Sequence, residues 1–158
     1  MTGSVNQNLM RRAAFASVGV SLLLVCLKTF GFFATYSVAM LASLADSALD
    51  LFTSTLNLFA VRSALTPADA EHRFGHGKAE PLAGLAQGAF ITASAMFLVI
   101  QSVERLIAPQ PVPHSFAALV VMAISIGCAI ALILYEKRVV AHTGSVAIAA
   151  DQTHYFAD

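Results

Sequence analysis

Two aspartates, Asp46 and Asp50, lie four positions apart inside an apolar stretch of the chain. At this spacing on a helix their side chains leave the same face, with about 5–6 Å between the Cβ atoms. Four further polar residues extend this face as a stripe: Ser43, Thr53, Ser54 and Asn57. Two carboxylates so close repel each other, and either a proton or a bound dication relieves the repulsion. Taken alone, the pair leaves two explanations open: protonated aspartates hydrogen-bonded between helices, or ligands for a divalent cation.

A second ionisable pair, His154 and Asp158, repeats the same spacing, and Asp151 lies one turn earlier on the same side. Together the two pairs offer one nitrogen and three oxygens. Such a set suits a tetrahedral Zn²⁺ site with bonds of about 2.0–2.2 Å. Because the set contains no thiolate, the ion stays exchangeable, as transport requires. The pattern predicts that Asp46, Asp50, His154 and Asp158 bind a divalent cation, and Cd²⁺, Fe²⁺, Mn²⁺ or Co²⁺ would be accepted as well as Zn²⁺.

A third group of possible ligands, Asp69, His72 and His76, lies in a short charged segment. One oxygen and two nitrogens are enough for an incomplete or open zinc site. Glycines at 75 and 77 leave the backbone free to turn sharply there. From the spacing alone, a solvated loop that binds nothing specific is an equally good interpretation. A metal bound there would be exposed, so we expect weak binding or regulation rather than transport.

The composition of the chain indicates what kind of structure holds these residues. Apolar residues make up 58% of the chain and charged residues 11%, where an ordinary globular domain has about 25% charged residues. The mean hydropathy is +0.75. These values predict a membrane protein. Basic and acidic residues balance at nine each, so no net charge favours nucleic acid, and nucleic-acid binding is excluded.

A membrane helix needs about 20 mostly apolar residues. Four stretches meet this length, at about 13–36, 38–64, 80–107 and 115–135, and a fifth begins at residue 145. The sequence thus predicts an all-α polytopic membrane bundle that follows a cytoplasmic N-terminal segment, 1–12. From residue 145 to the last residue the chain has 14 residues, which reach about 21 Å of the roughly 30 Å required. We therefore expect four complete spans and the first half of a fifth, in a chain cut short of its natural end.

The orientation of the bundle follows from its basic residues, because cytoplasmic loops retain lysine and arginine. Seven of them fall on the side of the N-terminus: Arg11, Arg12, Arg62, Arg73, Lys78, Lys137 and Arg138. Arg105 alone falls on the other side. The N-terminus is therefore predicted to be cytoplasmic. Lys28 lies within the first span, where it either snorkels outward or offsets an aspartate.

Three sequence motifs resemble those of one transporter family. The motifs DSALD at 46–50, FGHGKAE at 74–80 and HYFAD at 154–158 are similar to those of the cation diffusion facilitator family, in its bacterial zinc, cadmium and ferrous-iron efflux branch. The resemblance extends from about Arg11 to the last residue. It implies that the transport site of the family corresponds to Asp46, Asp50, His154 and Asp158. It also implies that a zinc site of the family corresponds to Asp69, His72 and His76.

The resemblance implies a function as well. Members of the family are homodimers of the bacterial cytoplasmic membrane that exchange a cytoplasmic divalent cation for external protons. They continue with a sixth span and a cytoplasmic C-terminal domain, which we expect to be missing here. We therefore expect a metal/proton antiporter, with Zn²⁺ as the first candidate. A membrane metal sensor or assembly partner without transport is the main alternative, and a proton-coupled exporter of organic cations is a second. An enzyme is disfavoured, since no nucleophile lies beside a base and no cofactor loop is present.

Overall fold

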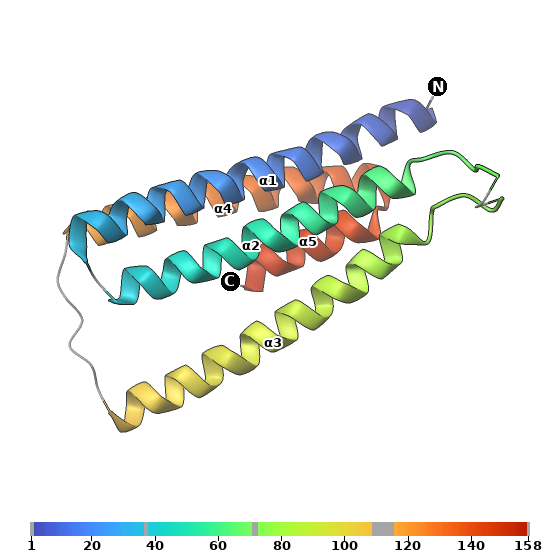
Figure 1. Ribbon diagram of the computed structural model, residues 1–158. Helices are drawn as coiled ribbons and strands as arrows, with labels where there is room; N and C mark the ends of the chain where they lie inside the picture. The colour runs from blue at the N-terminus through green and yellow to red at the C-terminus, as the bar shows by residue number, and fades with distance from the viewer. Residues whose placement is uncertain (1, 37, 71–72, 109–115, 158) are drawn as a thin grey trace.

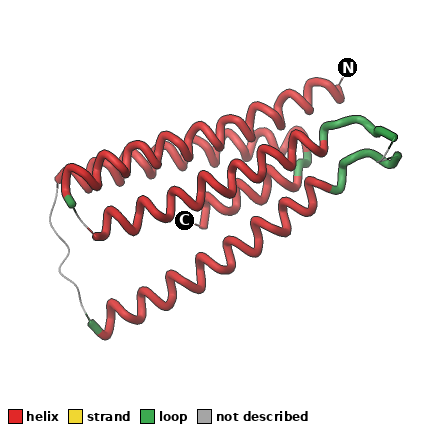
Figure 2. Tube along the Cα trace, viewed as in Figure 1, coloured by secondary structure: helices red, strands yellow, loops and turns green. Residues whose placement is uncertain are grey.

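The computed structural model describes residues 2–36, 38–70, 73–108 and 116–157. Within these ranges the chain forms five α-helices and no strand (Figure 1, Figure 2). The helices are α1 (Thr2–Thr35), α2 (Val38–Ala64), α3 (Ala79–Ile107), α4 (Phe116–Thr143) and α5 (Val146–Ala157). The expected all-α architecture is confirmed for the described residues.

Two helices are longer than the apolar stretches that predicted them. Helix α1 begins at Thr2, so most of the predicted N-terminal segment forms its first turns. Helix α4 continues past residue 135 as far as Thr143. The apolar pattern marks only the part of a helix that suits a membrane, whereas the helix continues until a residue stops it. No proline interrupts α1, because the first proline of the chain is residue 67. Helix α4 ends just before Gly144, which is the first glycine after Gly127.

Three of the described helical segments are long and apolar enough to cross a membrane: Val5–Thr35, Ala79–Glu104 and Phe116–Thr143. Helix α2 has a comparable length of 27 residues, but its aspartates and hydroxyl side chains lower its hydropathy. Together the three segments support a multi-pass membrane protein. The expectation of four complete spans and half of a fifth stays a prediction.

The bundle has an apolar exterior, and its interior combines an apolar cluster with many polar side chains. Large apolar side chains such as Phe30, Phe59 and Leu106 are 73%, 63% and 81% exposed. Buried inside are polar side chains on all five helices, among them Ser17, Asn57, Gln87, Glu136 and Asp151. In lipid an apolar exterior has no free-energy cost, so burial of apolar surface does not drive the helices together. Polar contacts and close packing hold them together instead. This distribution is expected of a membrane bundle.

Helix α5 is fixed at its start by α3 and by a glycine turn. Gly144 has a φ of 66°, which places it in the left-handed region that glycine tolerates, and its N–H donates to the carbonyl of Val140 at 2.8 Å. Glu80 of α3 accepts hydrogen bonds from the Ser145 hydroxyl and from the N–H of Ala147. The carboxylate of Glu80 thus caps the N-terminus of α5. At this end α3 lies against the bundle, and it diverges from the other helices toward its C-terminus (Figure 1).

Candidate metal centre between α2 and α5

One face of α2 is polar and turned into the bundle. Ser47, Asp50, Ser54 and Asn57 are spaced by three or four residues along it, and all are buried. Thr53, beside this row, is 2% exposed. Residues at these intervals share a helix face. The polar stripe seen in the sequence therefore faces the neighbouring helices rather than lipid.

His154 meets this face from α5. Its Nε2 atom lies 3.2 Å from Oδ1 of Asp50, and the two residues are 3% and 6% exposed. The Thr53 hydroxyl lies 3.3 Å from the same nitrogen and donates to the backbone carbonyl of Asp50 at 3.0 Å. A nitrogen and a carboxylate oxygen from two helices therefore converge on one buried point, as the repeated spacing predicted for these two residues.

The separation of these two atoms suits neighbouring ligands of one metal ion. Two donors at about 2.0–2.1 Å from a tetrahedral ion are separated by about 3.3 Å. The Asp50 Oδ1 to His154 Nε2 distance of 3.2 Å is close to that edge. Without an ion, a proton shared between the two atoms would satisfy the same contact. The pair can therefore hold either a metal ion or a proton, at a place where solvent contributes little.

Asp46 lies one turn from Asp50 but is less buried. It is close enough to Asp50, Lys28 and His154 to interact with them electrostatically. In the part of the chain that the structure describes, no three His, Cys, Asp or Glu side chains gather into a group ready to hold a metal ion. The fourth predicted ligand, Asp158, lies outside the described residues. The structure thus brings together two of the four predicted ligands, with the third nearby.

Lys28 points toward α2. Its Nζ atom donates to the backbone carbonyl of Ser43 at 3.2 Å, three residues before Asp46. The side chain therefore neither snorkels freely nor forms an ion pair of its own with an aspartate at contact distance in the described residues. Instead it places a positive charge one helix turn from Asp46.

A hydroxyl cluster beside the centre fixes the rotation of α5 and was missed in the sequence. The Tyr155 hydroxyl lies 3.1 Å from the Ser54 hydroxyl and also bonds Ser21 of α1. Ser17 and Ser21 both donate to Ser54, at 2.8 and 3.1 Å. Because Tyr155 directly follows His154, this cluster holds the imidazole toward α2. Serines of the first helix gave no signal in the sequence, since their role depends on which helix packs beside them.

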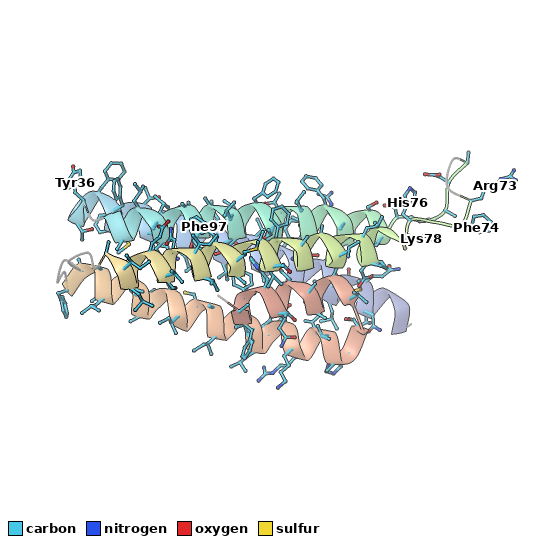
Figure 3. The ribbon with its side chains drawn as sticks, turned by 90° about the horizontal axis from the view of Figure 1, so that it is seen from below. Tyr36, Arg73, Phe74, His76, Lys78 and Phe97 are labelled. Carbon is cyan, nitrogen blue, oxygen red and sulfur yellow. The ribbon has the colours of Figure 1, made fainter. Side chains whose placement is uncertain are left out.

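The loop residues form a second, exposed pair. His76 Nε2 lies 3.7 Å from Oδ2 of Asp69, and their side chains are 19% and 50% exposed. The backbone turns at Gly75, with a φ of 75°. Figure 3 shows His76 close to Lys78, at the end of the bundle opposite Tyr36. The remaining predicted ligand of this group, His72, lies outside the described residues.

Comparison with known proteins identifies the family of the chain. Residues 14–158 match the cation efflux transmembrane domain. The chain belongs to the cation efflux family, as its three motifs indicated. This cation efflux chain is 45% identical over 146 residues to the cation-efflux pump FieF of Shewanella oneidensis, covering 92% of the chain and 49% of that relative. It is also 45% identical over 150 residues to the FieF pump of Citrobacter koseri, covering 95% of the chain and 50% of the relative.

A third relative is the FieF pump of Escherichia coli strain K12, 43% identical over 150 residues. The chain therefore spans about half the length of the curated relatives it matches. The motifs that carry the resemblance lie within residues 14–158, which match the cation efflux transmembrane domain.

A further buried acid was not singled out from the sequence. Glu136 of α4 is 0% exposed and interacts with Asp151 of α5. Lys137 and Arg138 follow it directly, so the sequence around Glu136 is typical of a membrane interface. The signal that distinguishes Glu136 from an interface residue is its position on the buried face of α4, in register with the other buried residues of that helix.

Proposed function

We propose that this chain is the membrane part of a divalent-cation efflux transporter that exchanges metal for protons, with Zn²⁺ as the preferred cargo. Asp46, Asp50, His154 and Asp158 are the proposed ligands. The observation that carries the proposal is the buried contact between Asp50 and His154, made by ionisable groups of two different helices. Such groups inside a membrane bundle mark ion and proton pathways. The cation-efflux pumps that the chain resembles support the same reading.

Proton coupling follows from competition for the same atoms. A metal ion requires ionised carboxylates and a neutral imidazole, so its binding releases protons and acid displaces it. At 3.2 Å the Asp50 and His154 pair can share one proton when the metal has left. Facing the cytoplasm the site would load metal, and facing the more acidic outside it would exchange the metal for protons. Rocking of helices around a fixed site would provide the alternating access.

Several features of the whole protein are part of this proposal. We place it in a bacterial cytoplasmic membrane, with the N-terminus and residues 1–12 in the cytoplasm, and we propose that it acts as a homodimer. The domain described here would be 13–158, with a sixth span and a cytoplasmic domain beyond it. Asp69, His72 and His76 would form an accessory metal site, because the Asp69 and His76 side chains already approach each other in the loop.

Zinc-driven proton flux in liposomes tests the proposal. In the full-length protein, Asp50→Ala removes one of the two converging donors, so we expect flux to fall to the level of empty liposomes. Glu104→Ala, at an exposed position of α3, is the matched control and should retain flux. Flux at the wild-type level in Asp50→Ala would contradict the proposal.

A counterflow assay separates the transporter from a membrane metal sensor. Liposomes preloaded with unlabelled zinc should accumulate labelled zinc if the site alternates between the two sides. A sensor with the same ligands would bind zinc and accumulate none. Binding without counterflow by the wild-type protein would therefore favour the sensor.

A further inference from the structure

All five helices place a polar side chain at one level of the bundle interior. Asn57 and Glu136 lie near the C-terminal ends of α2 and α4, and Gln87 and Asp151 near the N-terminal ends of α3 and α5, so the set lies toward the end that carries the α2–α3 loop and the α4–α5 turn. Ser17, Glu136 and Asp151 are each 0% exposed. Asn57 and Gln87 are 1% and 3% exposed. None of the five belongs to the proposed metal ligands, and Asp151 lies one turn before His154 on α5.

The hydrogen bonds of this set leave several oxygens without a donor. Gln87 Nε2 donates to Oδ1 of Asp151 at 2.9 Å. Within the described part of the chain, the other Asp151 oxygen and both oxygens of Glu136 have no hydrogen bond of ordinary geometry, although Ser17 and Asn57 lie near Asp151. The carboxyl groups of Glu136 and Asp151 nevertheless interact with each other. Two neighbouring buried carboxyl groups therefore have three oxygens that accept no hydrogen bond of ordinary geometry.

A proton completes this contact. Two ionised carboxylates at close range repel each other, and burying both without a counter-charge is costly. A protonated carboxyl group becomes a hydrogen-bond donor, so one added proton removes a charge and supplies the missing donor. The titratable groups that also interact with the pair are His154 and Tyr155, both on α5. The contributions from α1, α2 and α3 are Ser17, Asn57 and Gln87, which do not titrate.

We propose that Glu136 and Asp151 form a proton-binding site in which one proton is shared between the two carboxyl groups, about one helix turn from His154. A proton fits this place better than a metal ion, since the described residues there include two carboxyl groups and no third His, Cys, Asp or Glu ligand. The site is distinct from the metal centre, and its proton does not have to leave when metal binds to Asp50 and His154. It would store a proton between the loop end of the bundle and the metal centre.

Infrared spectroscopy of the metal-free, full-length protein in lipid tests the proposal. A protonated carboxyl group has a carbonyl stretching band that a carboxylate lacks. At neutral pH we expect wild-type protein to show this band and Glu136→Gln to lose intensity equivalent to one group. Glu104→Gln, which changes an exposed glutamate, should leave the band unchanged. An unchanged band in both Glu136→Gln and Asp151→Asn would overturn the proposal.

Isotope labelling keeps the test valid if these variants fold poorly. Carboxyl-labelled glutamate in wild-type protein, and carboxyl-labelled aspartate in a second sample, shift the band of the residue that carries the proton. A shift with the glutamate label, or with the aspartate label in an Asp46→Ala/Asp50→Ala background, supports the site, and a wild-type spectrum with no protonated carboxyl band contradicts it. Zinc affinity is measured on the same samples. A wild-type protein that binds no zinc would contradict the proposed function and leave the infrared result standing.

Discussion

The chain carries two carboxylate–imidazole pairs with the same chemistry in opposite surroundings. Asp50 and His154 lie 3.2 Å apart between two helices and are almost fully buried. Asp69 and His76 lie 3.7 Å apart in a loop, with side chains 50% and 19% exposed. Water and salt screen the loop pair, whereas the buried pair must be neutralised by a proton or a cation. In the proposed transporter, burial rather than ligand type would therefore make one pair suitable for coupled transport and the other for weak binding.

The largest expected effect separates the two histidines. His154→Ala should lower zinc flux by about 100-fold or more, because even the partners of metal ligands change affinity by about 10–100-fold when removed. His76→Ala should leave flux within about threefold of wild type, since its site is exposed and lies in the loop. Proteoliposome flux assays of both variants give the comparison. Equal losses in the two variants would mean that burial does not distinguish the pairs.

A change in pH should also have a large effect on the zinc affinity of the buried pair. Zinc binding at the buried pair displaces the proton shared by Asp50 and His154, so the affinity should fall as the pH falls. One displaced proton corresponds to about a tenfold change in the dissociation constant per pH unit. Calorimetric titrations of Asp69→Ala protein, in buffers of different ionisation enthalpy, would measure both the affinity and the released protons. A pH-independent affinity with no proton release would argue against shared occupancy of the site.

A smaller effect is expected for the threonine that touches the imidazole. Thr53→Val keeps the side-chain shape but removes the hydroxyl that lies 3.3 Å from His154 Nε2. We expect zinc affinity to weaken by about tenfold, the lower limit for a residue that orients a ligand. Thr55→Val is the matched control, since the Thr55 hydroxyl bonds the carbonyl of Leu51 on its own helix. A similar loss in both variants would indicate a general effect on α2.

The smallest effects are expected for two glycines with positive φ, one in the turn before α5 and one in the loop that carries Asp69 and His76. Gly144 and Gly75 have φ values of 66° and 75°, so alanine at either position is strained by about 1 kcal/mol. Gly144→Ala should lower the thermal stability of the bundle and weaken zinc binding a few-fold, because Gly144 precedes α5. Gly75→Ala should change neither, as the strain stays in the loop. A destabilisation that is larger for Gly75→Ala would show that the loop supports the bundle.

Much of this arrangement could be predicted from spacing. The interval between Asp46 and Asp50 indicated the face of α2 on which Asp50 is buried against His154 of α5, and the apolar stretches located the helices. Helix ends were less predictable, since α1 and α4 extend into polar sequence where hydropathy gives no signal. Ser21, Tyr155 and Glu136 were missed for a different reason. Each of these residues acts through a contact with another helix, and the sequence pattern of a single helix does not show which helices pack beside it.

The most direct test of the central claim is the zinc-edge X-ray absorption spectrum of the full-length protein with Asp69→Ala and His76→Ala, which remove the loop pair. We predict a tetrahedral shell of nitrogen and oxygen at about 2.0 Å, with the outer-shell scattering of one imidazole. Adding His154→Ala should eliminate the imidazole signal or the bound zinc. An imidazole signal that persists with bound zinc after this substitution would contradict the proposed metal centre, because the ion would then lie elsewhere than between α2 and α5.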